Sequence, residues 1–247
     1  MTIKSKADLA GMKRAGRLVA DALQHLASAL KPGITTGQLD DVGAKFIRAR
    51  GGRSAPQLTY RFPGFNLISV NDQIVHGVPG SRVLQPGDLV KLDVTVELDG
   101  FVADAARTIP LPGAPDVARR LTRCAKRAFT AGMAQARDGR PVRGIGRAIE
   151  HEVARDGFAV VRELTGHGVG HTIHESPTVL NYEDPHDRTM LHEGMVLAVE
   201  PIITERPTRT VEEADGWTIR TRSHVLAAHY ENTIVVQSGR PLILTAA

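Results

Sequence analysis

The sequence contains a single cysteine, Cys124, in 247 residues, so no disulfide bond can form within the chain. Free thiols are typical of a reducing compartment, and we therefore expect a cytoplasmic location. Cys124 lies in a helical pattern, which favours a core thiol over a nucleophile. The N-terminal segment lacks the apolar run of a signal peptide, and no stretch approaches the roughly 18 apolar residues of a membrane span. We expect neither export nor a membrane partner.

Aromatic residues make up only 4% of the chain, which argues against base-stacking platforms and sequence-specific nucleic acid binding. The formal net charge of +4 is spread along the sequence without a block of like charges. Such an excess fits an acidic neighbour such as a ribosome surface, but only weakly. The sequence also lacks a phosphate-binding G-x-x-x-x-G-K-[ST] loop, a G-x-G-x-x-G fingerprint and a G-x-S-x-G nucleophile elbow. Nucleotide and serine-hydrolase chemistries therefore have no support.

Two aspartates, Asp93 and Asp104, interrupt strongly apolar runs on either side of Asp99-Gly100. Asp-Gly between alternating apolar residues predicts a two-residue β-hairpin turn. In that register Thr95 faces Asp104, and Asp93 lies on the same face of the hairpin. The carboxylates would be diagonal neighbours about 7–8 Å apart at the backbone. Two buried anions this close need a proton, a base or a cation between them.

The chain also reads as two similar halves, each with a helix pair followed by an H-x-x-P motif and an apolar strand that leads to an acid. Ser5-x-x-Asp8 and Thr35-x-x-Gln38 predict the caps of the first pair, and residues 121–139 and 142–157 predict the second. H-x-x-P occurs at His76 and at His174, and glycine plus five mostly apolar residues precedes both Asp93 and Glu200. We predict an α+β fold in one domain, 1–247, with halves of roughly 1–110 and 111–247.

Three further residues are candidate partners of the two aspartates: His167 in a glycine-rich segment, Glu200 at a strand end, and Glu231 entering the apolar strand 233–236. An H-E-x-x-H zinc helix is excluded, because the segment around His167 has neither the glutamate nor the helix. Four carboxylates and one imidazole suit Mn, Fe, Co or Zn. Two such ions about 3.5–4 Å apart would neutralise this cluster.

Each of these residues also has an ordinary explanation. A single strand aspartate more often ends a ladder or caps a turn, Glu231 could form a surface ion pair, and His76 could be a turn residue. Because five such residues occur in matching sequence contexts, a dinuclear metal site explains them as well as these ordinary roles do. The remaining histidines are expected to have no role in the site: His25, His151, His171, His186, His192, His224 and His229.

Five segments together are similar to the type I methionine aminopeptidases, the smaller bacterial branch of the pita-bread metallopeptidases. They are "VNDQIVHGVPG", "GDLVKLDVTVELDGFVADAART", "GHGVGHTIHESP", "GMVLAVEP" and "YENTIVV", and the similarity spans nearly the whole chain. The resemblance implies the duplicated pita-bread fold, in which helix-helix-strand units surround a curved antiparallel sheet. It also implies two divalent metal ions and removal of the initiator methionine from nascent proteins and peptides, with a small second residue preferred.

The resemblance implies a role for each site residue. Asp104 and Glu231 would bridge two ions, Asp93 would chelate one of them, and His167 and Glu200 would hold the other. Beyond the resemblance, we expect Glu200 also to accept the proton of the attacking water. The two histidines of the H-x-x-P motifs, His76 and His174, would contact substrate and assist catalysis without holding metal.

The predicted methionine pocket departs from the family pattern at two positions. Leu67 stands where the family often has a cysteine or a similar small residue, and Ile173 stands where it often has a phenylalanine. Trp217 matches a family tryptophan near the pocket. Both changes remain apolar, so methionine still fits.

Two alternatives remain at the level of sequence. Proline-directed relatives, the aminopeptidases P and prolidases, share the ligand set but usually carry an additional N-terminal domain, for which Asp93 falls too early. A non-catalytic pita-bread binding module would keep the fold and lose ligands, whereas every ligand position is filled here. We expect a monomer that acts on peptides with a free N-terminal methionine.

Overall fold

The computed structural model describes residues 1–246, which form five α-helices and fifteen short or medium β-strands. The helices are α1 (Lys6–Ala29), α2 (Thr36–Arg48), α3 (Ala55–Tyr60), α4 (Asp116–Met133) and α5 (Arg143–Arg155). Among these residues no helix has both the length and the apolar character that crossing a membrane requires.

The strands form four antiparallel sheets. The first has β1 (Arg53–Ser54), β4 (Leu89–Leu98) and β2 (Leu67–Val70), with β5 (Phe101–Pro110) paired to β4. The longest path has β15 (Leu242–Ile243), β14 (Asn232–Val235), β9 (Val196–Val199), β7 (Gly166–Gly168) and β8 (Glu175–Val179). One three-stranded sheet has the order β13 (Ala227–His229), β10 (Ile202–Thr204) and β6 (Ala159–Val160). The other has the order β11 (Thr210–Glu212), β12 (Ile219–Thr221) and β3 (Gln73–Val75).

The predicted helix starts of the first half are confirmed. Ser5 Oγ accepts a hydrogen bond from Asp8 N, and the Asp8 carboxylate accepts from the backbone of Ser5 in return. Thr35 and Gln38 form the same reciprocal box at the start of α2. These boxes satisfy backbone N–H groups that a helix start leaves without partners.

The predicted hairpin is also confirmed. Asp99 and Gly100 have φ values of 52° and 85°, the left-handed pair that a tight two-residue turn requires. Thr95 lies opposite Asp104, as the sequence predicts, and the ladder continues to the pairing of Leu89 with Pro110. The turn sequence therefore fixes the register that places both aspartates on one face.

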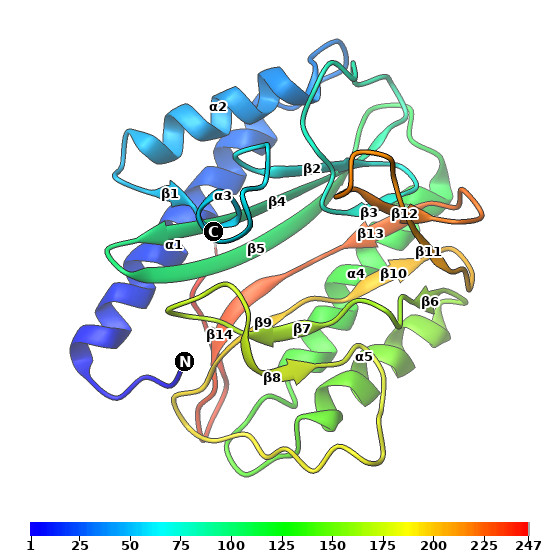
Figure 1. The fold of residues 1–247 in the computed structure, drawn as a ribbon. Coiled ribbons are helices and arrows are strands. Elements are labelled where there is room, and N and C mark those ends of the chain that lie inside the picture. Colours follow the sequence, from blue (N-terminus) through cyan, green and yellow to red (C-terminus); the bar gives the residue numbers. More distant parts are fainter. Residues whose placement is uncertain (247) are drawn as a thin grey trace.

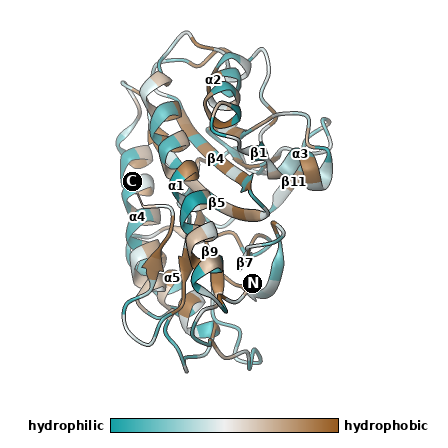
Figure 2. Cartoon of the chain, turned by 90° about the vertical axis from the view of Figure 1, so that its left-hand side faces the viewer, coloured by the Kyte–Doolittle hydropathy of each residue, from teal (hydrophilic) through white to brown (hydrophobic). Residues whose placement is uncertain are grey.

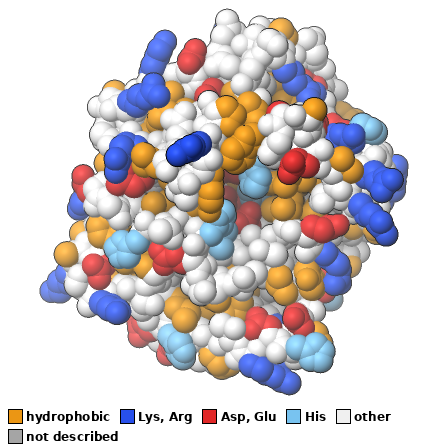
Figure 3. All heavy atoms as spheres, viewed as in Figure 1, with side chains coloured by type: hydrophobic (Ala, Val, Ile, Leu, Met, Phe, Trp, Pro, Cys, Tyr) orange, Lys and Arg blue, Asp and Glu red, His pale blue; other side chains and the backbone are white. Residues whose placement is uncertain are grey.

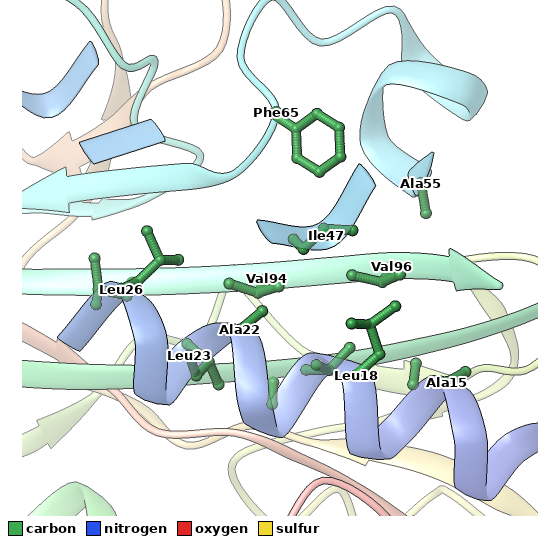
Figure 4. Packing of buried hydrophobic residues seen from close by; sticks show 14 of the residues in the cluster. Ala15, Leu18, Ala22, Leu23, Leu26, Ile47, Ala55, Phe65, Val94 and Val96 are labelled. Atoms are coloured by element: carbon green, nitrogen blue, oxygen red, sulfur yellow. The ribbon is translucent and has the colours of Figure 1, made fainter. Parts of the chain in front are cut away.

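Helices α1, α4 and α5 cover one side of the strands, whereas the short α3 lies on the opposite side (Figures 1 and 2). Helix α1 packs along the β4–β5 hairpin, where Leu18, Leu23 and Leu26 meet Val94 and Val96 in one core cluster (Figure 4). Each fully buried aliphatic side chain of this kind stabilises the fold by about 1.5–3 kcal/mol. A second cluster joins α4 and α5 to β9 and β14. Apolar packing against helices thus holds both the β4–β5 hairpin and the strands β9 and β14 in place.

Side-chain hydrogen bonds connect the first half to the second at the centre of the molecule. Thr233 Oγ1 accepts from Asp104 N at 2.9 Å and donates to Asp104 O at 2.8 Å. Close by, Glu231 N donates to Ala106 O at 3.0 Å, and Thr108 Oγ1 donates to His229 O at 2.8 Å. Strand β5 therefore lies beside β13 and β14, and this contact brings the acids of the two halves together.

The structure corrects several details of the sequence interpretation. Helix α4 starts at Asp116, five residues before the predicted segment, and the strand after Glu231 covers Asn232–Val235 rather than 233–236. The short helix α3 has no counterpart among the predicted elements. Asp93 lies within the ten-residue β4, whereas Glu200 directly follows the end of β9, so the two repeat acids have different local settings.

Candidate metal centre and active-site cleft

A cavity of about 560 Å³ opens on the side of the strands away from α1, α4 and α5, and both halves contribute to its wall. In the space-filling view the hollow near the centre shows acidic and histidine side chains in its depth and hydrophobic side chains around it (Figure 3). Charged side chains at the bottom of a cavity with apolar side chains around them are typical of a catalytic cleft.

The five candidate ligands meet at the floor of this cavity. Asp93 lies on β4, Asp104 on β5 and His167 on β7, while Glu200 and Glu231 directly follow β9 and precede β14, respectively. Asp104, His167, Glu200 and Glu231 are buried. The structure thus brings together every residue that the sequence proposed as a ligand.

The side chains of the cluster lie close together, but some of their polar atoms have no hydrogen-bond partner within residues 1–246. His167 Nε2 lies 3.4 Å from Glu200 Oε1, and Asp104 Oδ1 accepts a hydrogen bond from Thr95 Oγ1 at 2.9 Å. His167 Nδ1 lies 2.9 Å from the carbonyl oxygen of Gly168, which leaves Nε2 toward the acids. An imidazole fixed through one nitrogen presents the other as a metal ligand.

Burial raises the pKa of every carboxyl group in the cluster. The pKa of Asp104 and that of Glu200 rise to about 7, because both are removed from water. Burial also raises the pKa of Asp93 and of Glu231 well above their usual values, and repulsion from Asp104 adds to each. At neutral pH these four carboxyl groups therefore remain partly protonated unless a cation neutralises their negative charge.

Two groups of ligand atoms have the spacing for a metal ion. Asp93, His229 and Glu231 each offer an atom within 4.8 Å of the others, and so do Asp104, His167 and Glu231. Glu231 belongs to both groups, which is the position expected of a bridging carboxylate. The oxygen-rich donor set with imidazole suits Mn, Fe, Co or Zn.

Unpaired buried atoms give an independent test of whether a cation fits. Within the described part of the chain, Asp93 Oδ1, Glu231 Oε1 and both ring nitrogens of His229 have no hydrogen-bond partner. A buried polar group without a partner costs roughly 1–3 kcal/mol, and more when it is charged. Unpaired atoms on Asp93, Glu231 and His229, which form one of the two groups of potential ligand atoms, fit a divalent cation.

The sequence interpretation gave His229 no role, and the structure places its ring beside the acids. Its ring is only 2% exposed, and Nε2 lies 3.2 Å from Glu200 Oε2 and 3.7 Å from Glu231 Oε2. Burial lowers its pKa to about 4, so the ring is neutral and can offer a lone pair or one N–H group. The one available signal was its place two residues before Glu231 in the same extended segment.

His76 and His174, the histidines of the two H-x-x-P motifs, both line the cavity. His76 directly follows β3 with φ of 57°, and burial lowers its pKa to about 4. His174 directly precedes β8, and its ring meets that of His167 edge-on at 4.3 Å between centroids. Neither histidine belongs to the two groups of potential ligand atoms among the described residues.

The apolar part of the cavity contains all three predicted pocket residues, Leu67, Ile173 and Trp217. Sequence reasoning did not include Phe62, which packs edge-on against Trp217 at 5.3 Å between centroids. It also did not include Tyr60, whose hydroxyl lies 2.6 Å from His174 Nδ1. Aromatic residues at the end of a six-residue helix or in the loop after it carry no periodic signal that would separate pocket from core.

The fold and this acid-rich cleft define a metal-dependent hydrolase of the pita-bread type. Residues 10–238 match the model of metallopeptidase family M24, and the chain belongs to that family. "Methionine aminopeptidase 2" of Bacillus subtilis is 39% identical over 247 residues, which cover 99% of each chain. The crystal structure of methionine aminopeptidase from Rickettsia prowazekii has a TM-score of 0.95 at 35% identity, with 100% of both chains covered.

The same fold occurs in longer proline-directed enzymes. An Xaa-Pro dipeptidase from Bacillus anthracis has a TM-score of 0.80 at 21% identity, and this chain covers only 62% of its length. At that identity the comparison shows the shared fold alone. The relatives of matching length are methionine aminopeptidases, which favours the first sequence interpretation over the proline-directed alternative.

Metal should stabilise the protein more at pH 8 than at pH 5. The raised pKa of Asp104 and of Glu200 means that the folded chain holds extra protons between about pH 4 and 7. Metal-free stability therefore falls as pH rises through this range and levels off above it, by an amount on the order of several kcal/mol. Bound cations replace those protons, so the stabilisation of the folded protein by metal increases with pH.

The measurement is the thermal midpoint with and without saturating Mn²⁺ at pH 5, 6, 7 and 8. The difference between the paired curves cancels pH effects from groups remote from the cleft. A metal-induced shift of equal size at every pH would contradict the assignment of these carboxylates to a metal site.

Proposed function

We propose that this chain removes N-terminal methionine from nascent proteins and short peptides, using two divalent ions, Co, Mn, Fe or Zn. The proposed ligands are Asp93, Asp104, His167, Glu200 and Glu231. The observation that carries the proposal is the position of Glu231 in both groups of potential ligand atoms. Full-length relatives named methionine aminopeptidase support it.

Substrate orientation follows from the two parts of the cavity. Leu67, Ile173 and Trp217 offer an apolar wall for an unbranched thioether side chain. The acids would hold an ion at which the free amino group of the same residue can bind. A peptide without that terminal amine would lose this interaction, so the arrangement favours cleavage from the N-terminus.

When bound, the ions would supply Lewis acidity and lower the pKa of water, the chemistry that amide hydrolysis at neutral pH requires. The protein must then accept and return a proton. Glu200 is assigned this task in addition to its role as a ligand, because its carboxyl group borders the cavity. We propose that Glu200 takes the proton and passes it to the leaving amine.

Stabilisation of the developing oxyanion is assigned to His174. Burial lowers the pKa of this ring, so it is neutral at physiological pH and carries one N–H group. A positioned donor of this kind acts mainly where charge develops in the transition state. His76, also neutral, is proposed to meet the amide that follows the scissile bond. Both rings line the cavity beside the pocket residues, and we propose that the second residue of the substrate is small.

One assay separates this function from its alternatives. The protein is incubated with metal and either Met-Gly-type or Xaa-Pro-type peptides. Cleavage of the first alone supports the proposal, whereas cleavage of the second alone indicates a proline-directed enzyme. Inactivity on both with a filled metal site would indicate a binding module. A cytoplasmic monomer that works near the ribosome surface remains part of the proposal.

First-residue specificity gives a sharper prediction. Norleucine, which replaces the methionine sulfur with a methylene, should be hydrolysed within about 10–200-fold of methionine, the range of a small apolar misfit. Lysine should be rejected far more strongly, because the apolar wall leaves its ammonium without a partner. The kcat/KM values of Met-, Nle- and Lys-first peptides measure this. Equal turnover of the Lys and Met peptides would contradict the pocket assignment.

A further inference from the structure

Tyr60 forms a hydrogen bond that crosses the cleft from one half of the chain to the other. Its hydroxyl oxygen lies 2.6 Å from Nδ1 of His174, a residue 114 positions away in the sequence. The two rings are tilted by 37° with centroids 5.7 Å apart, so they meet through this edge rather than by stacking. Tyr60 therefore does more in the cavity than supply apolar surface.

Each partner is fixed by its own local structure. Tyr60 is the last residue of α3, which Ser54 caps at the start and Arg61 ends with φ of 60°. On the other wall, Glu175 Oε1 accepts from His171 N at 2.7 Å and Thr172 N at 3.0 Å. The loop that carries His174 is thereby held in one shape, and the phenol meets a ring whose orientation is already restricted.

The proton in this bond belongs to the phenol. A phenol is a donor or an acceptor, but the imidazole lone pair is the stronger base of the two. A neutral imidazole has one ring nitrogen free to accept, and the nitrogen that lies 2.6 Å from the phenol oxygen is Nδ1. When Nδ1 accepts, the ring proton resides on Nε2, at the edge away from Tyr60.

We propose that Tyr60 is a positioning residue that donates to His174 Nδ1 and so keeps the ring proton on Nε2, ready to donate to the substrate oxyanion. This inference rests on the proposed function, in which His174 is that donor. The other tautomer would present a lone pair to a developing negative charge, which is repulsive. Selecting one tautomer in advance is a form of electrostatic preorganisation.

The test compares Tyr60→Phe with the unchanged protein by two readouts. Loss of one hydrogen bond that acts in the transition state should lower kcat about tenfold. KM for a Met-first peptide should change less than about twofold, because phenylalanine keeps the ring and its packing. Tyr182→Phe is the matched control, since within residues 1–246 its hydroxyl makes no hydrogen bond, and it should leave both constants unchanged.

The second readout is the tautomer itself. Histidine labelled with ¹⁵N is followed by NMR in the full-length protein at pH 8, both metal-free and with diamagnetic Zn²⁺, and His174→Gln identifies the resonance. We expect the Nε2–H form in the unchanged protein and in Tyr182→Phe, and a mixture of tautomers in Tyr60→Phe. A merely structural role for Tyr60 would leave the ratio unchanged.

The outcomes separate this inference from the proposed function. Methionine release with the same tautomer ratio in Tyr60→Phe would overturn the role of Tyr60 alone. An Nδ1–H form in the unchanged protein would do the same. A ratio that shifts in Tyr60→Phe, in a protein that does not hydrolyse Met-first peptides, would uphold the contact and overturn the proposed function.

Discussion

Glu231→Gln is expected to abolish both metal binding and peptide hydrolysis. The substitution keeps the shape of the side chain and removes the charge that the two groups of ligand atoms share. Metal chemistry contributes several kcal/mol of transition-state stabilisation, so kcat/KM should fall by more than about 10³-fold. Metal analysis of the purified variant should show that both ions are affected, because a bridging ligand serves each of them. Asp104 belongs to one of the two groups, but we propose that it also bridges, so Asp104→Asn should affect both ions as well.

Glu193→Gln is the control for this experiment. It makes the same chemical change on an exposed residue outside the cavity and should leave metal content and activity intact. Chelator treatment of the unchanged protein should likewise remove activity, which Co²⁺, Mn²⁺ or Fe²⁺ should restore. Full activity in excess chelator would contradict the proposal of a dinuclear metal site.

His174→Ala and His167→Ala are expected to lose activity for different reasons. His174 is assigned to the substrate, so its variant should keep the metal and the fold while kcat falls about 10²–10³-fold, the usual effect of removing one oxyanion donor. His167 is assigned to metal, with Nε2 directed at Glu200. Its variant should bind metal weakly and recover part of its activity when metal is added.

The measurement is metal stoichiometry beside kcat for both variants over a series of metal concentrations. His186→Ala, an exposed histidine outside the cleft, is the matched control and should match the unchanged protein. If His174→Ala loses metal while His167→Ala retains it, the two roles are reversed and the proposed mechanism fails.

The features that could be predicted from sequence are those encoded by short-range rules. Asp99-Gly100 fixed the turn and, through strand alternation, the common face of Asp93 and Asp104. The Ser5 and Thr35 capping boxes marked two helix starts. These signals involve residues a few positions apart, whose geometry depends little on the remainder of the chain.

The parts that were missed depend on contacts between distant segments. His229 has no motif of its own, and its place among the acids results from the packing of β5 against β13. Helix α3 is six residues long, too short for a periodic pattern. The bond from Tyr60 to His174 joins opposite walls of the cleft. Tertiary packing alone creates these neighbours.

The hydrogen bonds between Asp104 and Thr233 also have a consequence for biosynthesis. They connect residues 129 positions apart, and the first half supplies only Asp93 and Asp104 to the proposed ligand set. During vectorial synthesis the metal centre cannot assemble until Glu231 has emerged, close to the end of the 247-residue chain. Contacts of such long sequence separation also form late in folding. Premature termination before Glu231 would therefore yield a polypeptide that lacks the carboxylate shared by both groups of ligand atoms.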